Sequence, residues 1–93
     1  NVIYIDTGAP TDITLTANPS FIFGVLISPS AVTGGVFVLT KGTVAAPTHI
    51  AIRIKLLDDQ SRYIPFNIPI LCTTAINVTL TTITSAQIYG IFE

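Results

Sequence analysis

Charge is scarce in this chain, because lysine, arginine, aspartate and glutamate make up only 10% of its 93 residues, against about 25% in typical soluble domains. The four basic residues, Lys41, Arg53, Lys55 and Arg62, are spread over several segments. Binding to a phosphate backbone needs a basic patch, so we expect no nucleic-acid partner. Disordered chains combine low hydrophobicity with high charge. This chain has little charge and 49% hydrophobic residues, so we expect it to fold.

Cysteine and histidine are almost absent, with a single Cys72 and a single His49. One cysteine excludes an internal disulfide and a cysteine metal cluster, and we expect Cys72 to be a small buried residue. His49 has no evident nucleophile or carboxylate partner, and Asp58 and Asp59 lack the spacing of a calcium loop. We therefore expect no catalytic residue, no metal ligand and no cofactor, and interpret the protein as a non-enzyme.

Long apolar runs are also missing. The longest run, residues 21–27, contains seven residues, whereas a membrane-spanning helix needs about 18 or more. We also find no basic segment followed by an apolar stretch and a small-residue cleavage site. We expect neither a membrane partner nor a signal peptide.

What the sequence does contain is alternation of apolar and polar residues. In residues 49–56, Ile50, Ile52 and Ile54 alternate with more polar positions, and residues 76–82 repeat this pattern. A period of two predicts a strand with one buried face. Eight short strands are predicted, at residues 2–5, 12–16, 21–28, 36–40, 49–56, 62–66, 76–82 and 87–92. The predicted inward side chains are Ile13, Leu15, Ile50, Ile52, Ile54, Ile76, Val78 and Leu80.

Turn-forming glycine and proline residues separate these segments, and no segment has the period of a helix. We therefore predict a single all-β domain over residues 1–93. Its expected architecture is a small antiparallel β-sandwich, jelly-roll-like, of about eight short strands. The segments 21–28 and 36–40 are expected to be neighbouring strands.

Residues 21–28 and 87–92 are apolar on both faces, although a sandwich strand needs only one apolar face. In the first segment, Phe21, Phe23, Val25 and Ile27 are expected on one face and Ile22 and Leu26 on the other. The second face of each segment should be covered by a terminal segment or by another chain. The candidate subunit contacts are Phe21, Phe23, Ile22, Leu26, Ile88 and Phe92.

Two other patterns have more than one interpretation. Asn77 begins the glycosylation pattern Asn-Val-Thr, but it also falls on the expected wet face of an alternating strand. The tyrosines Tyr4, Tyr63 and Tyr89 could form a sugar-stacking platform or lie separately at the edge of the core. The sequence leaves both questions open.

The segments FIFGVLISPSAVTGGVFVLTKGT, IPFNIPILCTTAINVTLTT and AQIYGIFE resemble, in this order, the small all-β virion proteins of tailed bacteriophages. The likeness consists of an apolar strand containing Phe23 and Gly24, a turn rich in glycine and proline at residues 29–35, and a PF-x-IP element from Pro65 to Pro69.

This resemblance implies a structural role as a head decoration, or cement, protein. It implies synthesis in the host cytoplasm, a place on the capsid surface of the virion, and binding across junctions of the major capsid protein as a homotrimer. A tail or fibre component and a carbohydrate-binding β-sandwich used in host attachment are the alternatives.

Overall fold

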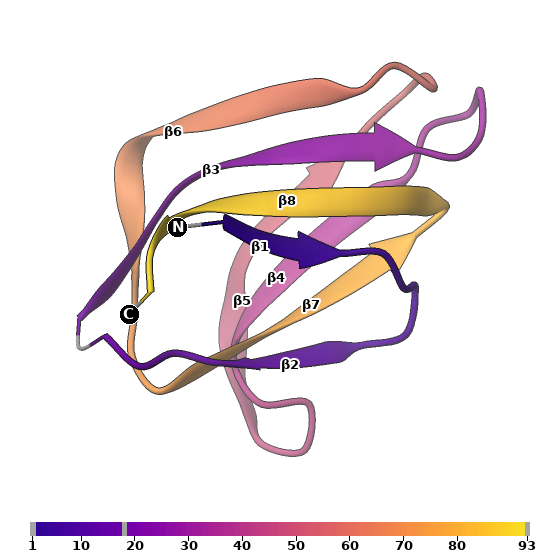
Figure 1. Cartoon of the computed structure of the whole chain (residues 1–93). Helices are drawn as coiled ribbons and strands as arrows, with labels where there is room; N and C mark the ends of the chain where they lie inside the picture. Colours follow the sequence, from indigo (N-terminus) through magenta and orange to yellow (C-terminus); the bar gives the residue numbers. More distant parts are fainter. Residues whose placement is uncertain (1, 18, 93) are drawn as a thin grey trace.

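The computed structural model describes residues 2–17 and 19–92, in which eight strands form two antiparallel sheets and no helix occurs (Figure 1). The predicted all-β sandwich is confirmed. The strands are β1 (Val2–Ile5), β2 (Thr11–Thr14), β3 (Ser20–Pro29), β4 (Val36–Gly42), β5 (Pro47–Lys55), β6 (Arg62–Cys72), β7 (Ala75–Thr81) and β8 (Ile83–Ile91).

The strand order is that of a jelly roll. Sheet A has the order β1-β8-β3-β6 and sheet B the order β2-β7-β4-β5. The pairs β4–β5, β3–β6, β2–β7 and β1–β8 are therefore nested inside one another along the chain. The expectation that β3 and β4 are neighbours is wrong, because the loop between them passes from sheet A to sheet B.

That loop requires glycine at Gly34, whose φ of 78° lies in the left-handed region. A Cβ atom at this position would also lie 1.8 Å from the Leu56 carbonyl oxygen. The amide of Leu56 donates a hydrogen bond to Gly35 O at 2.8 Å, so the crossing is tied directly to the end of β5.

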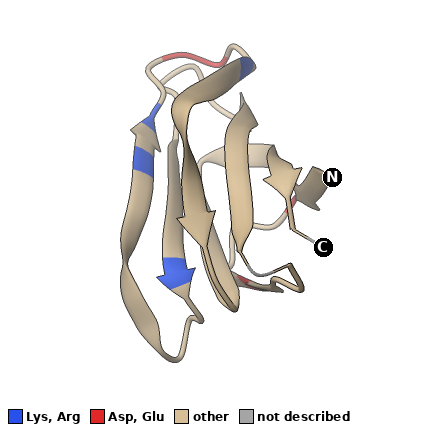
Figure 2. Cartoon of the chain, turned by 90° about the vertical axis from the view of Figure 1, so that its left-hand side faces the viewer, with Lys and Arg blue, Asp and Glu red and all other residues tan. Residues whose placement is uncertain are grey.

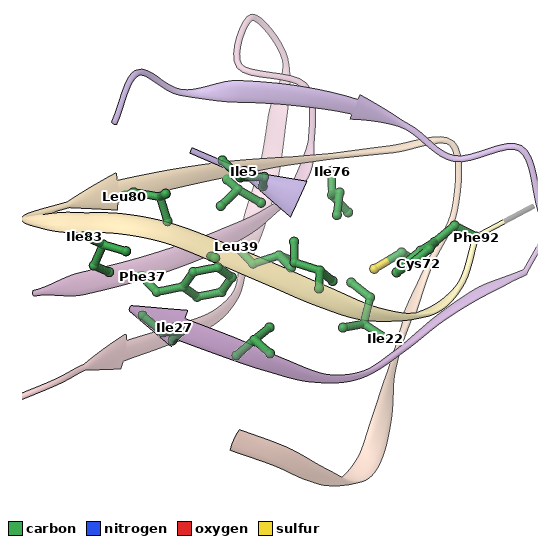
Figure 3. Close-up of a cluster of buried hydrophobic side chains, with 14 of the residues drawn as sticks. Ile5, Ile22, Ile27, Phe37, Leu39, Cys72, Ile76, Leu80, Ile83 and Phe92 are labelled. Carbon is green, nitrogen blue, oxygen red and sulfur yellow. The ribbon is translucent and has the colours of Figure 1, made fainter. Parts of the chain in front are cut away.

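One apolar core fills the space between the sheets (Figure 3). Its largest members come from both sheets, with Ile22, Ile27 and Ile88 from sheet A and Phe37 and Leu39 from sheet B, all with no exposed surface. Burying a side chain of this size stabilises a fold by about 1.5–3 kcal/mol. Of the predicted inward residues, Leu15, Ile76, Val78 and Leu80 are buried, and Ile13, Ile52 and Ile54 pack partly buried against the core.

A bulge in β3 changes which of its residues face the core. The pairing of β3 shifts between Ile22 and Gly24, so Phe23 is an extra residue in the strand. An extra residue reverses the alternation that follows it. Ile22 and Val25 consequently face the same side, the core, and Leu26 faces outward. The predicted division of β3 into two faces was wrong for this reason.

A second irregularity changes β5. Leu39 pairs with Ile52 and Thr40 with Ile50, so Ala51 is the extra residue. Ala51 packs against the core, while Ile50 turns outward and is 59% exposed. The inward assignment of Ile50 was therefore wrong.

Strand β6 is longer than predicted and bends sharply along its length (Figure 1). Between paired positions, β6 has the four residues 66–69 where β3 has only Phe23. Pro65 and Pro69 are compatible with a strand here because β6 is an edge of sheet A, where one side of the backbone has no partner strand. Pro69 lies beyond the end of the strand predicted at residues 62–66.

Candidate interaction surface

The outer face of sheet A brings together side chains from four strands that are distant in the sequence. Tyr4 of β1 pairs with Gln87 of β8, Gln87 with Leu26 of β3, and Leu26 with Tyr63 of β6. Paired residues point to the same side of a sheet, so these four side chains form one row. We define the aromatic face as the exposed or half-buried side chains of Val2, Tyr4, Phe21, Phe23, Leu26, Tyr63, Tyr89 and Ile91.

Gly24 makes room for the central contact on this face. A Cβ atom on Gly24 would lie 2.7 Å from the Tyr63 hydroxyl and 3.0 Å from Tyr63 Cζ, so the hydroxyl end of the Tyr63 ring lies over the glycine. The ring thereby reaches across β3 to Tyr89, with the ring centres 5.6 Å apart and the planes at 83°. This edge-to-face geometry is favourable for aromatic pairs. The Tyr89 hydroxyl donates a hydrogen bond to Gln87 Oε1 at 2.8 Å.

The strands under the aromatic face carry almost no charge. Strands β1, β3 and β8 contain no charged residue, and β6 contains only Arg62 at its first position. Arg62 is paired with Asp58 at 2.6 Å. Most of the cations lie in sheet B, where Figure 2 shows blue segments on the two neighbouring strands β4 and β5. The aromatic face is therefore electrically neutral.

The outer face of sheet B mixes polar and apolar side chains, with threonines, Arg53 and Lys55 beside Val36, Val38 and Ile50. Along β7, Asn77, Thr79 and Thr81 alternate with the buried Ile76, Val78 and Leu80. Asn77 is an exception to the expected exposure, because only 7% of it is accessible. Its Nδ2 donates to the carbonyl oxygen of Gly42 at 3.1 Å. A buried, hydrogen-bonded asparagine is unsuited to carry a sugar, so the expectation of an exposed Asn77 is corrected.

The predicted subunit contacts divide into two groups. Phe21, Phe23 and Leu26 lie on the aromatic face, available to a partner. The remaining three face the domain's own core and present almost no surface to another chain; this corrects the assignment of Ile22, Ile88 and Phe92. Ile22 was misplaced because of the β3 bulge, and Ile88 because β8 lies between β1 and β3 with its alternate residues inward.

The residues with chemical potential are dispersed. His49 pairs with Lys41 at the far end of β4 and β5, away from Asp58 and Asp59 in the loop before β6. The backbone amide of Gln60 and the Arg62 guanidinium both donate to Asp58 and hold the pKa of its carboxyl below its usual value. Burial raises the pKa of the Cys72 thiol, which makes it a poor nucleophile.

Within residues 2–17 and 19–92, no three histidine, cysteine, aspartate or glutamate side chains are placed to hold a metal ion. The same part of the chain forms no helix that is long and apolar enough to cross a membrane. No protein-family model matches the sequence, and a search of curated proteins found no match. The aromatic face is the feature on which we base a functional interpretation.

The sequence did not predict that the three tyrosines share one face. They lie in β1, β6 and β8, and only the pairing of β3 with both β6 and β8 brings Tyr63 and Tyr89 together. One signal was present: the outward positions of these strands lack charge, although outward positions are usually polar.

Proposed function

We propose that this domain is an assembly subunit that attaches to another protein through the aromatic face. The observation that carries the proposal is an uncharged, largely apolar surface spread over all four strands of sheet A. Soluble monomers seldom expose a contiguous apolar patch of more than a few hundred Å². A standard interface buries about 800 Å² on each partner, about one sixth of the 5082 Å² surface of this chain.

The resemblance to small virion proteins of tailed bacteriophages supports a more specific form of this proposal. In that form the domain is a head decoration protein on the capsid surface. Its partners are the major capsid protein and further copies of itself, arranged as a homotrimer. A low-charge interface suits this role, because burial of apolar surface does not depend on ion pairs that salt would screen.

A binding experiment with undecorated capsids tests the proposal. The purified chain should cosediment with capsids, and binding should persist as sodium chloride is raised. Leu26→Lys places a charge in the aromatic face and should abolish attachment. Thr79→Lys is the matched control, since Thr79 pairs with Val38 on the outer face of sheet B. Loss of attachment at moderate salt, or equal effects of the two variants, would contradict the proposal.

Carbohydrate binding is a second candidate function, favoured by the three tyrosines on one face. Tyr4 is 60% and Tyr63 53% exposed, so their rings are accessible to a ligand. Aromatic rings offer large rigid surfaces with a polar hydroxyl, and Gln87 adds an amide beside them. A glycan array with the isolated domain tests this candidate.

Two substitutions of Tyr63 bear on the two candidates. Tyr63→Phe removes a hydroxyl and keeps the ring, so attachment to a protein partner through apolar contact should be almost unchanged. Tyr63→Ala should abolish glycan binding if the ring stacks on a sugar. Capsid attachment without any glycan signal would exclude the second candidate, and the reverse result would exclude the first.

A further inference from the structure

A hollow of about 360 Å³ opens where the β4–β5 hairpin approaches the end of β6. Pockets for small ligands usually measure about 300–1,000 Å³, so this hollow suits a small molecule or a single side chain. Its walls include Lys41 of β4, Thr48 and His49 of β5, Leu71 of β6, and Thr73 and Thr74 in the turn before β7.

Among the described residues, the walls of this hollow carry positive charge only. Lys41 and His49 are paired across β4 and β5, so their side chains point to the same side. Lys41 is half-buried and forms no ion pair within the described part of the chain. In residues 2–17 and 19–92, no carboxylate belongs to the walls. Asp12 of β2, a strand separated from β4 by β7, accepts a hydrogen bond from the Val44 amide at 2.7 Å.

Neutral hydrogen-bond donors complete the site. The Thr48 hydroxyl donates to the Lys41 carbonyl oxygen at 3.0 Å. In the described residues, the hydroxyls of Thr73 and Thr74 have no hydrogen-bond partner within the chain, so both can donate to a ligand. The hollow therefore combines an ammonium group with two hydroxyl donors.

The turn that carries these hydroxyls has an unusual backbone. Thr74 has a φ of 60°, in the left-handed region that β-branched residues rarely adopt. Two hydrogen bonds hold it there: Ala75 N–H to Thr73 O at 2.7 Å and Leu15 N–H to Thr74 O at 2.8 Å. Backbone strain of this kind concentrates at ligand-binding positions.

We propose that this hollow binds a carboxylate group, with the Lys41 ammonium as its charge partner and the Thr73 and Thr74 hydroxyls as neutral donors. One permanent positive charge matches one carboxylate, whereas a phosphate dianion would leave a negative charge uncompensated. Leu71 of β6 also belongs to the walls. The carboxylate can belong to a free small acid or to an acidic side chain of a partner protein.

Titration of the isotopically labelled chain with butyrate, followed by amide NMR shifts at constant ionic strength, tests this site. Butyrate should shift the resonances of the walls and saturate, with a Kd of about 1 mM or tighter. Butyramide has the same shape without the charge and should leave them unchanged. Equal shifts with both compounds, or no saturable shift with butyrate, would overturn the proposal.

Two lysine substitutions provide the matched pair of variants. Lys41→Gln should weaken butyrate binding about tenfold, because a charge-assisted hydrogen bond is lost. Lys55→Gln removes the same charge at the other end of β5 and should leave binding unchanged. His49→Gln is a second variant of the site in case Lys41→Gln is unstable; it should weaken binding less. Equal binding by the wild type and all three variants would contradict the assignment.

The source of the carboxylate is decided by a capped peptide that contains one glutamate. If the peptide binds more tightly than butyrate, the site takes an acidic side chain of a protein; if butyrate binds more tightly, it takes a free acid. Leu26→Lys should not change either affinity. The inference can therefore fail while the proposed role of the aromatic face stands, and the reverse also holds.

Discussion

The two outer faces of this sandwich differ although the two sheets are built in the same way. Both sheets have four strands in the described chain and direct alternate residues into one core. Outside, sheet A presents tyrosine, phenylalanine and leucine without charge, whereas sheet B presents threonines and the cations Arg53 and Lys55 of β5, together with Val36, Val38 and Ile50. Only the inner residues are dictated by the fold, so the difference outside reflects what each face meets. This difference supports the proposal that sheet A attaches to another molecule.

The edge strands of both sheets are protected against pairing with another chain, which favours an interaction through the face of sheet A. Unpaired edge strands invite other strands to add to the sheet, and proteins block them with charge, proline or short length. Here β1 and β2 have only four residues each. The edge β5 carries Arg53 and Lys55, and the edge β6 carries Pro65 and Pro69. All four edges are thus protected, while the aromatic face is not.

The largest expected effect on stability is the difference between a substitution in the shared core and one on the aromatic face. Phe37→Ala should lower the free energy of unfolding by about 3–5 kcal/mol, because Phe37 is completely buried between the sheets and leaves a cavity. Phe23→Ala should cost much less, since Phe23 lies on the bulge and is 40% exposed. Urea denaturation of both variants measures the difference. Similar losses would show that Phe23 supports the fold rather than an interface.

The second largest effect on stability is expected at Gly24 of β3, which leaves room for the Tyr63 ring. Gly24→Val should destabilise the fold by about 1–3 kcal/mol through overpacking. The new Cβ would lie 2.7 Å from the Tyr63 hydroxyl and 2.9 Å from the Ile64 carbonyl oxygen. Near-ultraviolet circular dichroism should show that the contact between Tyr63 and Tyr89 is lost. An unchanged tyrosine signal would mean that the Tyr63 ring does not depend on the glycine.

A smaller effect is expected from the aromatic pair itself. Tyr63→Leu keeps an apolar side chain and removes the edge-to-face contact with Tyr89, which is worth about 0.5–1.5 kcal/mol. Thr79→Ala on the opposite face should change stability by less than about 0.5 kcal/mol. Thermal unfolding of the Tyr63→Leu and Thr79→Ala variants in the same buffer can measure this difference in stability. A larger loss of stability from Thr79→Ala than from Tyr63→Leu would contradict this prediction.

The smallest effect should come from the ion pair at the start of β6. Asp58 has a lowered pKa in the folded state, so its contribution is present above the unfolded pKa, about 3.9, and is lost as pH falls through the folded pKa. The difference in urea midpoint between the wild type and Asp58→Asn should therefore become smaller as the pH is lowered through this range. Capsid attachment should be the same for both at neutral pH, because the pair lies at the loop end of β6. A dependence of attachment on Asp58 would show that sheet A binds partly through charge.

The sequence predicted the strands more reliably than it predicted their faces. Alternation located a strand in every region where one occurs in the described chain, because it records burial on one side. It could not show that Phe23 and Ala51 are extra residues, since a bulge exists only relative to the partner strand. The second half of β6 was missed because the tolerance of a strand for Pro69 depends on its position at an edge.

The aromatic face was predicted only in part, because it too depends on how the strands pair. Phe21, Phe23 and Leu26 could be identified from the surplus of apolar residues in one segment. Their grouping with Tyr4 and Tyr63 depends on pairing between strands that are far apart in the chain. No local pattern contains that information.

Nested strand pairing also sets the order in which the two sheets can close. The β4–β5 hairpin joins neighbouring segments, whereas β1 and β8 lie at opposite ends of the chain. Closing longer loops is entropically less favourable, and folds dominated by distant contacts form in about milliseconds to seconds. Because sheet A contains both β1 and β8, we expect its outer face to be completed last, once β8 has left the ribosome. The chain has three tyrosines and no tryptophan, and all three tyrosines lie on that face. Tyrosine fluorescence during refolding should therefore recover in the slowest phase, together with competence to attach.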